Sequence, residues 1–244
     1  MNKKIIINSD DFGLTRGVNY GILDSWKNKS ISAISMMVNA PEASHAFELI
    51  KENKMDCVGV HVNVTLGIPV SNPDNVPSLI DETGKFHSSK WYLAGNQINE
   101  DELILEFDIQ IQKFIKETNM MPDHINYHHI YDFYNEYPKL FNFLVNKYHL
   151  PMRLERDYEN YPYQYVSKKD LFINFDKLDL SAYLTQNLVE LPAHIGFCDK
   201  QLMNISSMNT SRMDDYDLAN SKEFKDLYTS LGYELVGWKE IDKK

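Results

Sequence analysis

Cysteine and long apolar runs are both scarce in this sequence. Two cysteines, Cys57 and Cys198, are too few for a disulfide framework, and no C-x-x-C pair occurs. Free thiols are typical of a reducing compartment. The longest apolar runs, such as residues 5–7, fall far short of the roughly 20 residues that a membrane-spanning helix needs, and they are also too short for the apolar region of a signal peptide. These absences predict a cytoplasmic protein with no membrane partner.

The chain also lacks an excess of basic residues. It carries 25 lysines and arginines against 35 aspartates and glutamates, which gives a formal net charge of −10. Nucleic-acid binding and docking on anionic lipid both need a basic face, so the charge argues against both. Gly/Ser-rich linkers and internal repeats are absent as well, which predicts a single domain over residues 1–244 with a sizeable core.

Short β-rich runs alternate with helical patterns along the chain. The clearest strand is 57–65, in which valines alternate with polar residues, so that one face packs and the other is polar and usable. Helical spacing recurs between strands, for example at Val18, Ile22 and Trp26. Repeated β-then-α order predicts an α/β fold with a mostly parallel sheet, either open or closed into a barrel. The expected strands are residues 3–8, 32–38, 57–65, 124–129, 151–155, 188–195 and 233–238.

One long segment, residues 67–99, has no periodicity and contains three prolines. A loop of this length inside a compact domain is typically a lid or a binding loop. Trp91 and Tyr92 within it offer rings on which a sugar could stack. We therefore expect this segment to be a lid over a binding site.

Polar side chains stand where several of the expected strands end. Asp10 and Asp11 directly follow the apolar run of the first strand. Taken alone, this pair is best explained as the N-cap of the next helix, although a buried carboxylate pair also fits a metal or an arginine. His61 lies on the polar face of 57–65, where a lone histidine is usually structural. Strand ends of this kind meet at one edge of a parallel α/β sheet, where catalytic groups collect.

Histidines cluster in the strand expected at 124–129. His124, His128 and His129 fall within six residues, out of 8 histidines in the chain. His124 and His128 share a face whether the segment is a strand or a helix, so this cluster is a plausible source of a metal ligand. His194, near the end of the strand expected at 188–195, is a candidate general acid or base, with a surface histidine as the alternative. Four strand ends that offer Asp or His together indicate a hydrolytic metal site.

The order of these motifs resembles the YdjC-like carbohydrate deacetylase family, whose members include chitooligosaccharide deacetylases. The resemblance rests on residues 10–13 (DDFG), 59–65 (GVHVNVT) and 122–129 (PDHINYHH), with weaker matches around Arg153 and Arg212. These markers run in family order over nearly the full length. The resemblance implies an irregular (β/α) barrel of about seven parallel strands, related to polysaccharide deacetylases. It also implies removal of an acetyl group from N-acetylated mono- or oligosaccharides.

The resemblance further implies roles for individual residues. The implied metal ligands are Asp11, His61 and His128. Asp10 is the implied catalytic base and His194 the implied proton donor to the departing amine. Arg153 is expected to orient Asp10 through a charge-assisted hydrogen bond. The residues expected to contact the substrate are Asn63, Trp91, His129 and Arg212.

This chain departs from the family at one point. The family usually shows Asp-Ser-His-His-His, whereas residues 126–130 read Asn-Tyr-His-His-Ile here. The ligand position is kept, but substrate contacts are expected to differ, and His124 could replace His128 or support it. The resemblance favours Mg²⁺, while imidazole ligands also suit Zn²⁺ or another transition metal.

Two alternative interpretations stay open. The same residues could serve a metal-dependent hydrolase of another bond, such as a phosphoester or a different amide. A degenerate site would instead leave a sugar-binding or regulatory protein. The favoured interpretation takes a small N-acetylated sugar as its partner, and oligomer frequency alone favours a homodimer.

Overall fold

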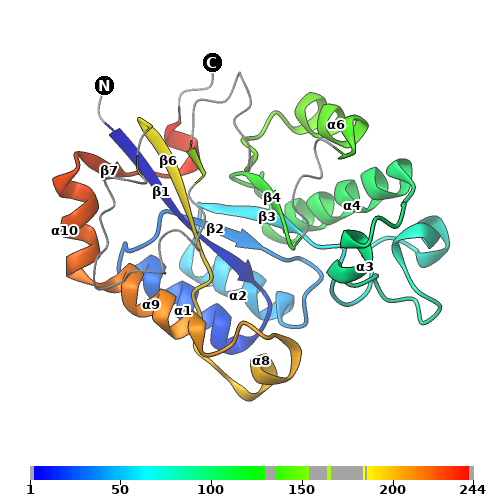
Figure 1. Cartoon of the computed structure of the whole chain (residues 1–244), viewed down its shortest axis with the longest axis horizontal. Helices are drawn as coiled ribbons and strands as arrows, with labels where there is room; N and C mark the ends of the chain where they lie inside the picture. The colour runs from blue at the N-terminus through cyan, green and yellow to red at the C-terminus, as the bar shows by residue number, and fades with distance from the viewer. Residues whose placement is uncertain (1–2, 130–135, 154–163, 166–183, 185, 242–244) are drawn as a thin grey trace.

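The computed structural model describes residues 3–129, 136–153, 164–165, 184 and 186–241 (Figure 1). The strands are β1 (Lys3–Phe12), β2 (Ala33–Met36), β3 (Val58–Val62), β4 (Ile125–Tyr127), β5 (Gln164–Tyr165), β6 (Leu188–Ala193) and β7 (Tyr233–Leu235). The α-helices are α1 (Arg16–Lys27), α2 (Ala43–Asn53), α3 (Ser89–Leu93), α4 (Glu100–Thr118), α6 (Pro138–Tyr148), α8 (Lys200–Ile205), α9 (Ser211–Asn220) and α10 (Lys222–Ser230). The 3₁₀ helices are η1 (Pro73–Asn75), η2 (Pro77–Leu79) and η5 (Trp238–Glu240).

A parallel sheet organises the fold. Its strand order is β4-β3-β2-β1-β6-β5, with β7 paired to the first residues of β1, and the pairs between these strands are all parallel. The sheet curls into a half-barrel, with α1, α2 and α9 packed below the central strands in Figure 1. The expected α/β fold with a parallel sheet is therefore confirmed. The carboxyl ends of β1, β2, β3 and β4 lie on the same side because neighbouring strands run the same way.

The strands differ from their expected bounds where polar residues continue a buried strand. β1 extends to Phe12 because the residues after the apolar run are buried too and pair with β2. β3 covers only five residues, and both of its faces are buried, His61 included. The polar face of this strand is therefore turned into the protein. From the segment expected as a strand at 151–155, Met152 makes an isolated bridge to Ile125, and residues 154 and 155 lie outside the described part of the chain.

The helices cover the sheet with the apolar stripes that their periodicity predicts. α4 begins at the N-cap Asn99, whose side chain accepts a hydrogen bond from the Asp101 N–H. Its buried face includes Phe107, Ile111 and Phe114, and α4 packs on β3. Each such side chain contributes roughly 1.5–3 kcal/mol when it leaves water, which fixes α4 against the strand that carries His61.

Three of the described helices, α3, α8 and α9, are not marked by the sequence pattern. α3, η1 and η2 lie within residues 67–99, so this segment contains short helices as well as irregular chain.

Within the described residues, no helix combines the length and apolar character that crossing a membrane requires.

Candidate active site

Asp10 and Asp11 lie at the carboxyl end of the central strand, inside the protein. Both belong to β1 and both are buried. Asp11 has a φ of 70°, a left-handed backbone conformation that residues other than glycine rarely adopt away from special sites. The N-cap of α1 is Thr15, whose side chain accepts from the Val18 N–H. The N-cap explanation of the aspartate pair is therefore wrong.

Three buried side chains converge at the strand ends. Asp11 Oδ1 lies 3.3 Å from His61 Nε2 and 3.0 Å from His128 Nδ1. One atom from each of the three residues lies within 4.8 Å of the others, so this group could hold a metal ion. One carboxylate oxygen and two imidazole nitrogens suit a divalent cation that keeps open positions for water and substrate. β1, β3 and the residue after β4 supply the group, as parallel strands ending at one edge allow.

His124 occupies a different place from His128. Its ring lies over Gly59, where an added Cβ would come within 2.5 Å of ring atoms, and it stacks on Trp238 with centroids 5.2 Å apart. Its Nε2 lies 2.8 Å from Ser35 Oγ. His124 is thus outside the group that could hold a metal in the described residues, and hydrogen bonds through Ser35 and Asn126 connect it to His61.

Arg212 holds the second oxygen of Asp11. Its Nη2 donates to Asp11 Oδ2 at 2.6 Å, and both side chains are buried. Burial alone would raise the pKa of Asp11, but Arg212 and then His128 outweigh it and hold the pKa well below its usual value. Arg212 was expected to contact substrate. The structure places its guanidinium, from α9, against Asp11, a carboxylate of the candidate metal group, and the expected substrate contact stays a prediction.

Arg153 joins Asp10 to a second buried carboxylate. Its guanidinium donates to both oxygens of Asp10, at 2.6 and 3.0 Å, and through Nε to Glu190 Oε1 at 2.8 Å. Burial opposes ionisation of Asp10, yet Arg153 above all holds its pKa far below the usual range. Burial raises the pKa of Glu190. The expected contact between Arg153 and Asp10 is present, whereas the part played by Glu190 was missed, although a Glu within the apolar run of β6 was a signal for it.

His194 directly follows β6, and its charge affects the pKa of Asp10. The His194 N–H donates to Asp215 Oδ2 at 2.8 Å, which fixes this turn to α9. The pKa of Asp10 is raised by burial and lowered by Arg153, His61 and, to a smaller extent, His194. The sequence did not single out Asp215. The two ends of the candidate site, one on β1 and one after β6, are therefore brought to the same place by adjacent strand pairing.

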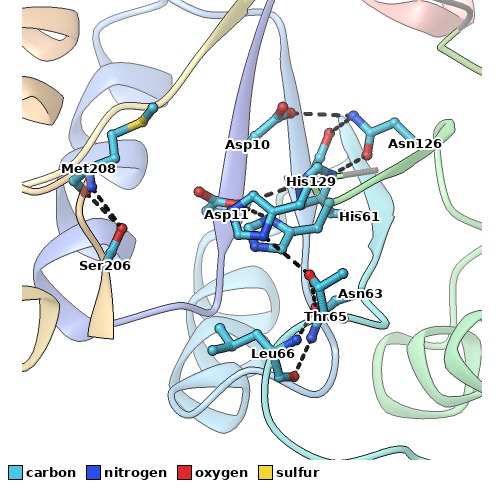
Figure 2. A network of polar contacts seen from close by, with 12 residues as sticks. Asp10, Asp11, His61, Asn63, Thr65, Leu66, Asn126, His129, Ser206 and Met208 are labelled. Atoms are coloured by element: carbon cyan, nitrogen blue, oxygen red, sulfur yellow. Dashed lines mark hydrogen bonds and ion pairs between the residues drawn. The ribbon is translucent and has the colours of Figure 1, made fainter. Parts of the chain in front are cut away.

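His129 and Asn63 both lie near the three candidate ligands, but their side chains have different surroundings (Figure 2). The exposed His129 packs its ring on His128, with centroids 3.6 Å apart, and its Nδ1 lies 3.2 Å from Thr65 Oγ1. Asn63 is fully buried: its Oδ1 accepts from the Thr65 and Leu66 N–H groups and its Nδ2 donates to the Leu66 carbonyl. Its side chain therefore stabilises the turn after β3, and the expected contact with substrate stays a prediction.

The segment 67–99 is attached to α4 at its beginning. The N–H groups of Val70 and Ser71 both donate to the carboxylate of Glu106, which is fully buried. A carboxylate that accepts two backbone hydrogen bonds is a firm anchor in a buried setting.

The same segment also contacts the carboxyl end of β3. Tyr92 Oη donates to the Val64 carbonyl at 3.1 Å. On the same short helix, α3, Trp91 stacks on His87 with ring centroids 3.8 Å apart. The aromatic part of this segment is thus docked next to the loop that follows His61.

The sequence of this chain matches a protein family over almost its full length. A family model described as YdjC-like protein matches residues 4–230. Carbohydrate deacetylase 2 of Listeria innocua serovar 6a is 28% identical over 99% of this chain and 100% of its own length. Chitooligosaccharide deacetylase of Yersinia enterocolitica serotype O:8 is 30% identical over 98% of this chain and 100% of its own.

Solved structures show the same fold. An Enterococcus faecalis V583 protein, described as a candidate cellobiose-phosphate cleavage protein, has a TM-score of 0.83 and 26% identity, with 100% of both chains covered. A polysaccharide deacetylase of Bacillus cereus has a TM-score of 0.50 and 12% identity over 98% of this chain and 93% of its own. The second likeness bears on the fold alone.

Proposed function

Because this chain belongs to the YdjC-like family, we propose that it is a metal-dependent hydrolase that removes the acetyl group from an N-acetylated mono- or oligosaccharide. The observation that carries the proposal is the buried Asp11–His61–His128 group beside the Asp10–Arg153 pair. The names of the relatives, carbohydrate and chitooligosaccharide deacetylases, supply the substrate class.

The three candidate ligands fit a divalent ion. Asp11 offers one oxygen, since Arg212 contacts the other, and each imidazole offers one nitrogen. When bound, such an ion supplies Lewis acidity, which polarises an amide carbonyl and lowers the pKa of water. We propose Mg²⁺ on the basis of the family resemblance, with Zn²⁺ as the ion that two imidazoles suit chemically.

The residues around this group divide the proton transfers. Asp10, kept ionised by Arg153, accepts the proton of the attacking water. Arg153 cannot rotate freely because it also contacts Glu190, so the carboxylate keeps one orientation. His194 gives a proton to the departing sugar amine. This histidine follows β6, which pairs with β1, the strand that carries Asp10. Two adjacent aspartates thus take different roles because they face different partners.

We expect His129 and Trp91 to contact the substrate. His129 is exposed next to His128, and Trp91 belongs to the segment docked beside β3. We propose that residues 67–99 act as a lid of a single domain and that the Trp91 ring packs against the sugar.

Acetate release tests this function. Purified protein would be incubated with N-acetylglucosamine and its β-1,4-linked dimer, with Mg²⁺ or Zn²⁺ added and again with EDTA. We expect acetate that appears with metal and disappears with chelator. Absence of acetate from every substrate, with metal bound at about one ion per chain, would contradict the proposal.

A second candidate is hydrolysis of another bond in a phosphorylated disaccharide. The observation in its favour is the description of the Enterococcus faecalis relative, which names cleavage of cellobiose phosphate. Cellobiose 6-phosphate incubated under the same conditions distinguishes the two, because this activity releases glucose or inorganic phosphate and no acetate.

A further inference from the structure

A pocket of about 280 Å³ lies at the opposite edge of the sheet from the candidate metal group (Figure 1). Ser32, Cys57 and Asp123 line it, and they stand one or two residues before β2, β3 and β4, at the amino ends of these strands. Lys239, from the chain that follows β7, lines another side. Cys57 lies four residues before His61, so roughly 13 Å of extended chain separates the pocket from the metal group.

The carboxylate of Asp123 lacks hydrogen-bond donors although it is buried. Asp123 is only 4% exposed, and neither of its oxygens accepts a hydrogen bond from the described residues. His124 Nδ1 at 3.9 Å and Lys239 Nζ at 4.0 Å are both beyond hydrogen-bond distance. The Asp123 N–H donates to the Val58 carbonyl, which fixes the residue in place. Buried carboxylate oxygens without donors are costly, so the geometry favours a ligand that donates hydrogen bonds to Asp123.

The other groups around the pocket favour a neutral ligand over a cation. Lys29 and Lys239 both line it, so an ammonium group of a ligand would lie beside like charges. Lys239 Nζ donates to the Asp56 carbonyl, and an ammonium has three hydrogens, so it can also donate to a ligand oxygen. Trp26, half-buried at the end of α1, adds apolar surface. Within the described residues, the group of side chains that could hold a metal lies elsewhere.

We propose that this pocket binds one neutral sugar ring, whose neighbouring hydroxyls donate to Asp123 and whose C–H face packs on Trp26. A hydroxyl both donates and accepts, so a single ring can satisfy the carboxylate and accept from Lys239. Amphipathic packing of this kind suits an indole. The volume is near the lower end of the range of small-molecule sites, about 300–1,000 Å³, as one ring requires. The sugar is held there without turnover, and the inference is independent of the bond that is hydrolysed at the other edge.

Indole N–H signals in NMR spectra test the site on the wild-type protein. The chain has three tryptophans, so Trp→Phe variants assign all of their signals. Protein in EDTA would be titrated with glucose, which has no acetyl group and is therefore no substrate of the proposed reaction. We expect the Trp26 signal to shift and to saturate at roughly millimolar glucose, an affinity ordinary for so small a ligand. A Trp26 signal that does not saturate, or a shift confined to Trp91, would overturn the inference.

Variants of the pocket supply the second readout, the dissociation constant of glucose. Asp123→Asn keeps the shape of the side chain but removes the charge, so we expect binding to weaken roughly 10- to 100-fold. Asp74→Asn removes the same charge at an exposed position of η1 and should leave the affinity unchanged. If Asp123→Asn does not fold, Lys239→Gln decides, because its side chain is 59% exposed and its loss should weaken binding several-fold. Wild-type affinity in the folded variant would contradict the proposal.

A cation without hydroxyls distinguishes the sugar from other ligands. Methylammonium chloride would replace glucose in the same titration, and we expect no saturable shift of the Trp26 signal. A saturable shift with methylammonium and none with glucose would overturn the inference in favour of a cation site. No saturable shift with either probe would mean that Asp123 is satisfied by solvent alone, and the inference would fail.

The outcomes also separate this inference from the proposed function. If glucose binds beside Trp26 but no acetate is released from any N-acetylated sugar, the inference holds and the proposed reaction fails. If acetate is released while glucose leaves the Trp26 signal unchanged, only the inference about this pocket fails.

Discussion

Arg153 contacts both oxygens of Asp10, at 2.6 and 3.0 Å, while neither side chain is more than 4% exposed. The same guanidinium also contacts Glu190, so one cation serves two buried carboxylates. Breaking a buried pair by removing one partner leaves an uncompensated charge, which costs about 3–5 kcal/mol. The geometry of Asp10 therefore depends on an arginine that lies 143 residues later in the sequence.

Arg153→Lys tests that dependence. Lysine keeps the charge but cannot contact two carboxylates in a planar fork. We expect kcat to fall by roughly 10²-fold, since general-base catalysis is worth about 10²–10⁴, with a lower melting temperature. Arg16→Lys, at an exposed ion pair with Glu42, is the matched control. A kcat within twofold of wild type would remove the Asp10–Arg153 geometry from the mechanism.

Asp10→Asn separates metal binding from turnover. Asp10 is outside the group that could hold the ion, so we expect metal content to stay near wild type while kcat drops by roughly two or more orders of magnitude. Metal is measured by elemental analysis and turnover by acetate release. The exposed Asp74→Asn in η1 should change neither. A wild-type rate in Asp10→Asn would exclude this residue as the base.

His61→Ala and His128→Ala should each lose the metal. Each removes one of the three candidate ligands, whereas the exposed His149→Ala leaves all of them. Because an ion that binds only the folded state stabilises it, about 2.7 kcal/mol at 100 times the dissociation constant, metal should raise the melting temperature of the wild type and of His149→Ala alone. Full metal content in both ligand variants would refute the ligand assignment.

Acidification should destabilise the protein through Asp11. Its folded-state pKa is held well below the ordinary 3.8 by Arg212 and His128, against the effect of burial. Below pH 3.8 the unfolded chain therefore binds more protons, so this contribution to stability is present above that pH and is lost as pH falls toward the folded-state pKa. Urea unfolding between pH 2.5 and 6 should show a smaller fall in the free energy of unfolding for Asp11→Asn than for wild type. An equal fall in the free energy of unfolding for the two proteins would show that Asp11 is not the cause of the acid sensitivity.

Trp91→Ala tests the proposed lid. If the indole packs against the sugar, KM should rise several-fold with little change in kcat, because a contact present in both ground and transition states affects binding alone. Leu93→Ala, whose side chain is 70% exposed on the same helix, is the control. Unchanged KM, together with protease sensitivity of 67–99 that substrate does not alter, would argue against the lid.

Local sequence predicted the elements whose cause is local. An apolar run that stops at two aspartates located β1, alternating valines located β3, and apolar residues at helical spacing located α1. The same logic placed the aspartate pair, His61 and the histidines of 124–129 at one edge, because parallel strands end together. The family resemblance then selected Asp11, His61 and His128 among them. α9 escaped detection because most of its residues are polar, and its buried residues are Arg212, Asp215 and Ala219.

The sequence by itself determined the parallel α/β frame and which polar residues stand at its strand ends, since hydrophobic periodicity and strand direction are properties of short segments. Only the tertiary structure decided the partners of those residues. Arg212 pairs with Asp11, which lies 201 positions earlier in the sequence. The Asn63 side chain forms hydrogen bonds within the turn that follows β3. His124, near His128 in sequence, lies behind Ser35. These outcomes depend on which charges share a buried space, and a buried charge is stable only where the whole fold supplies its counterpart.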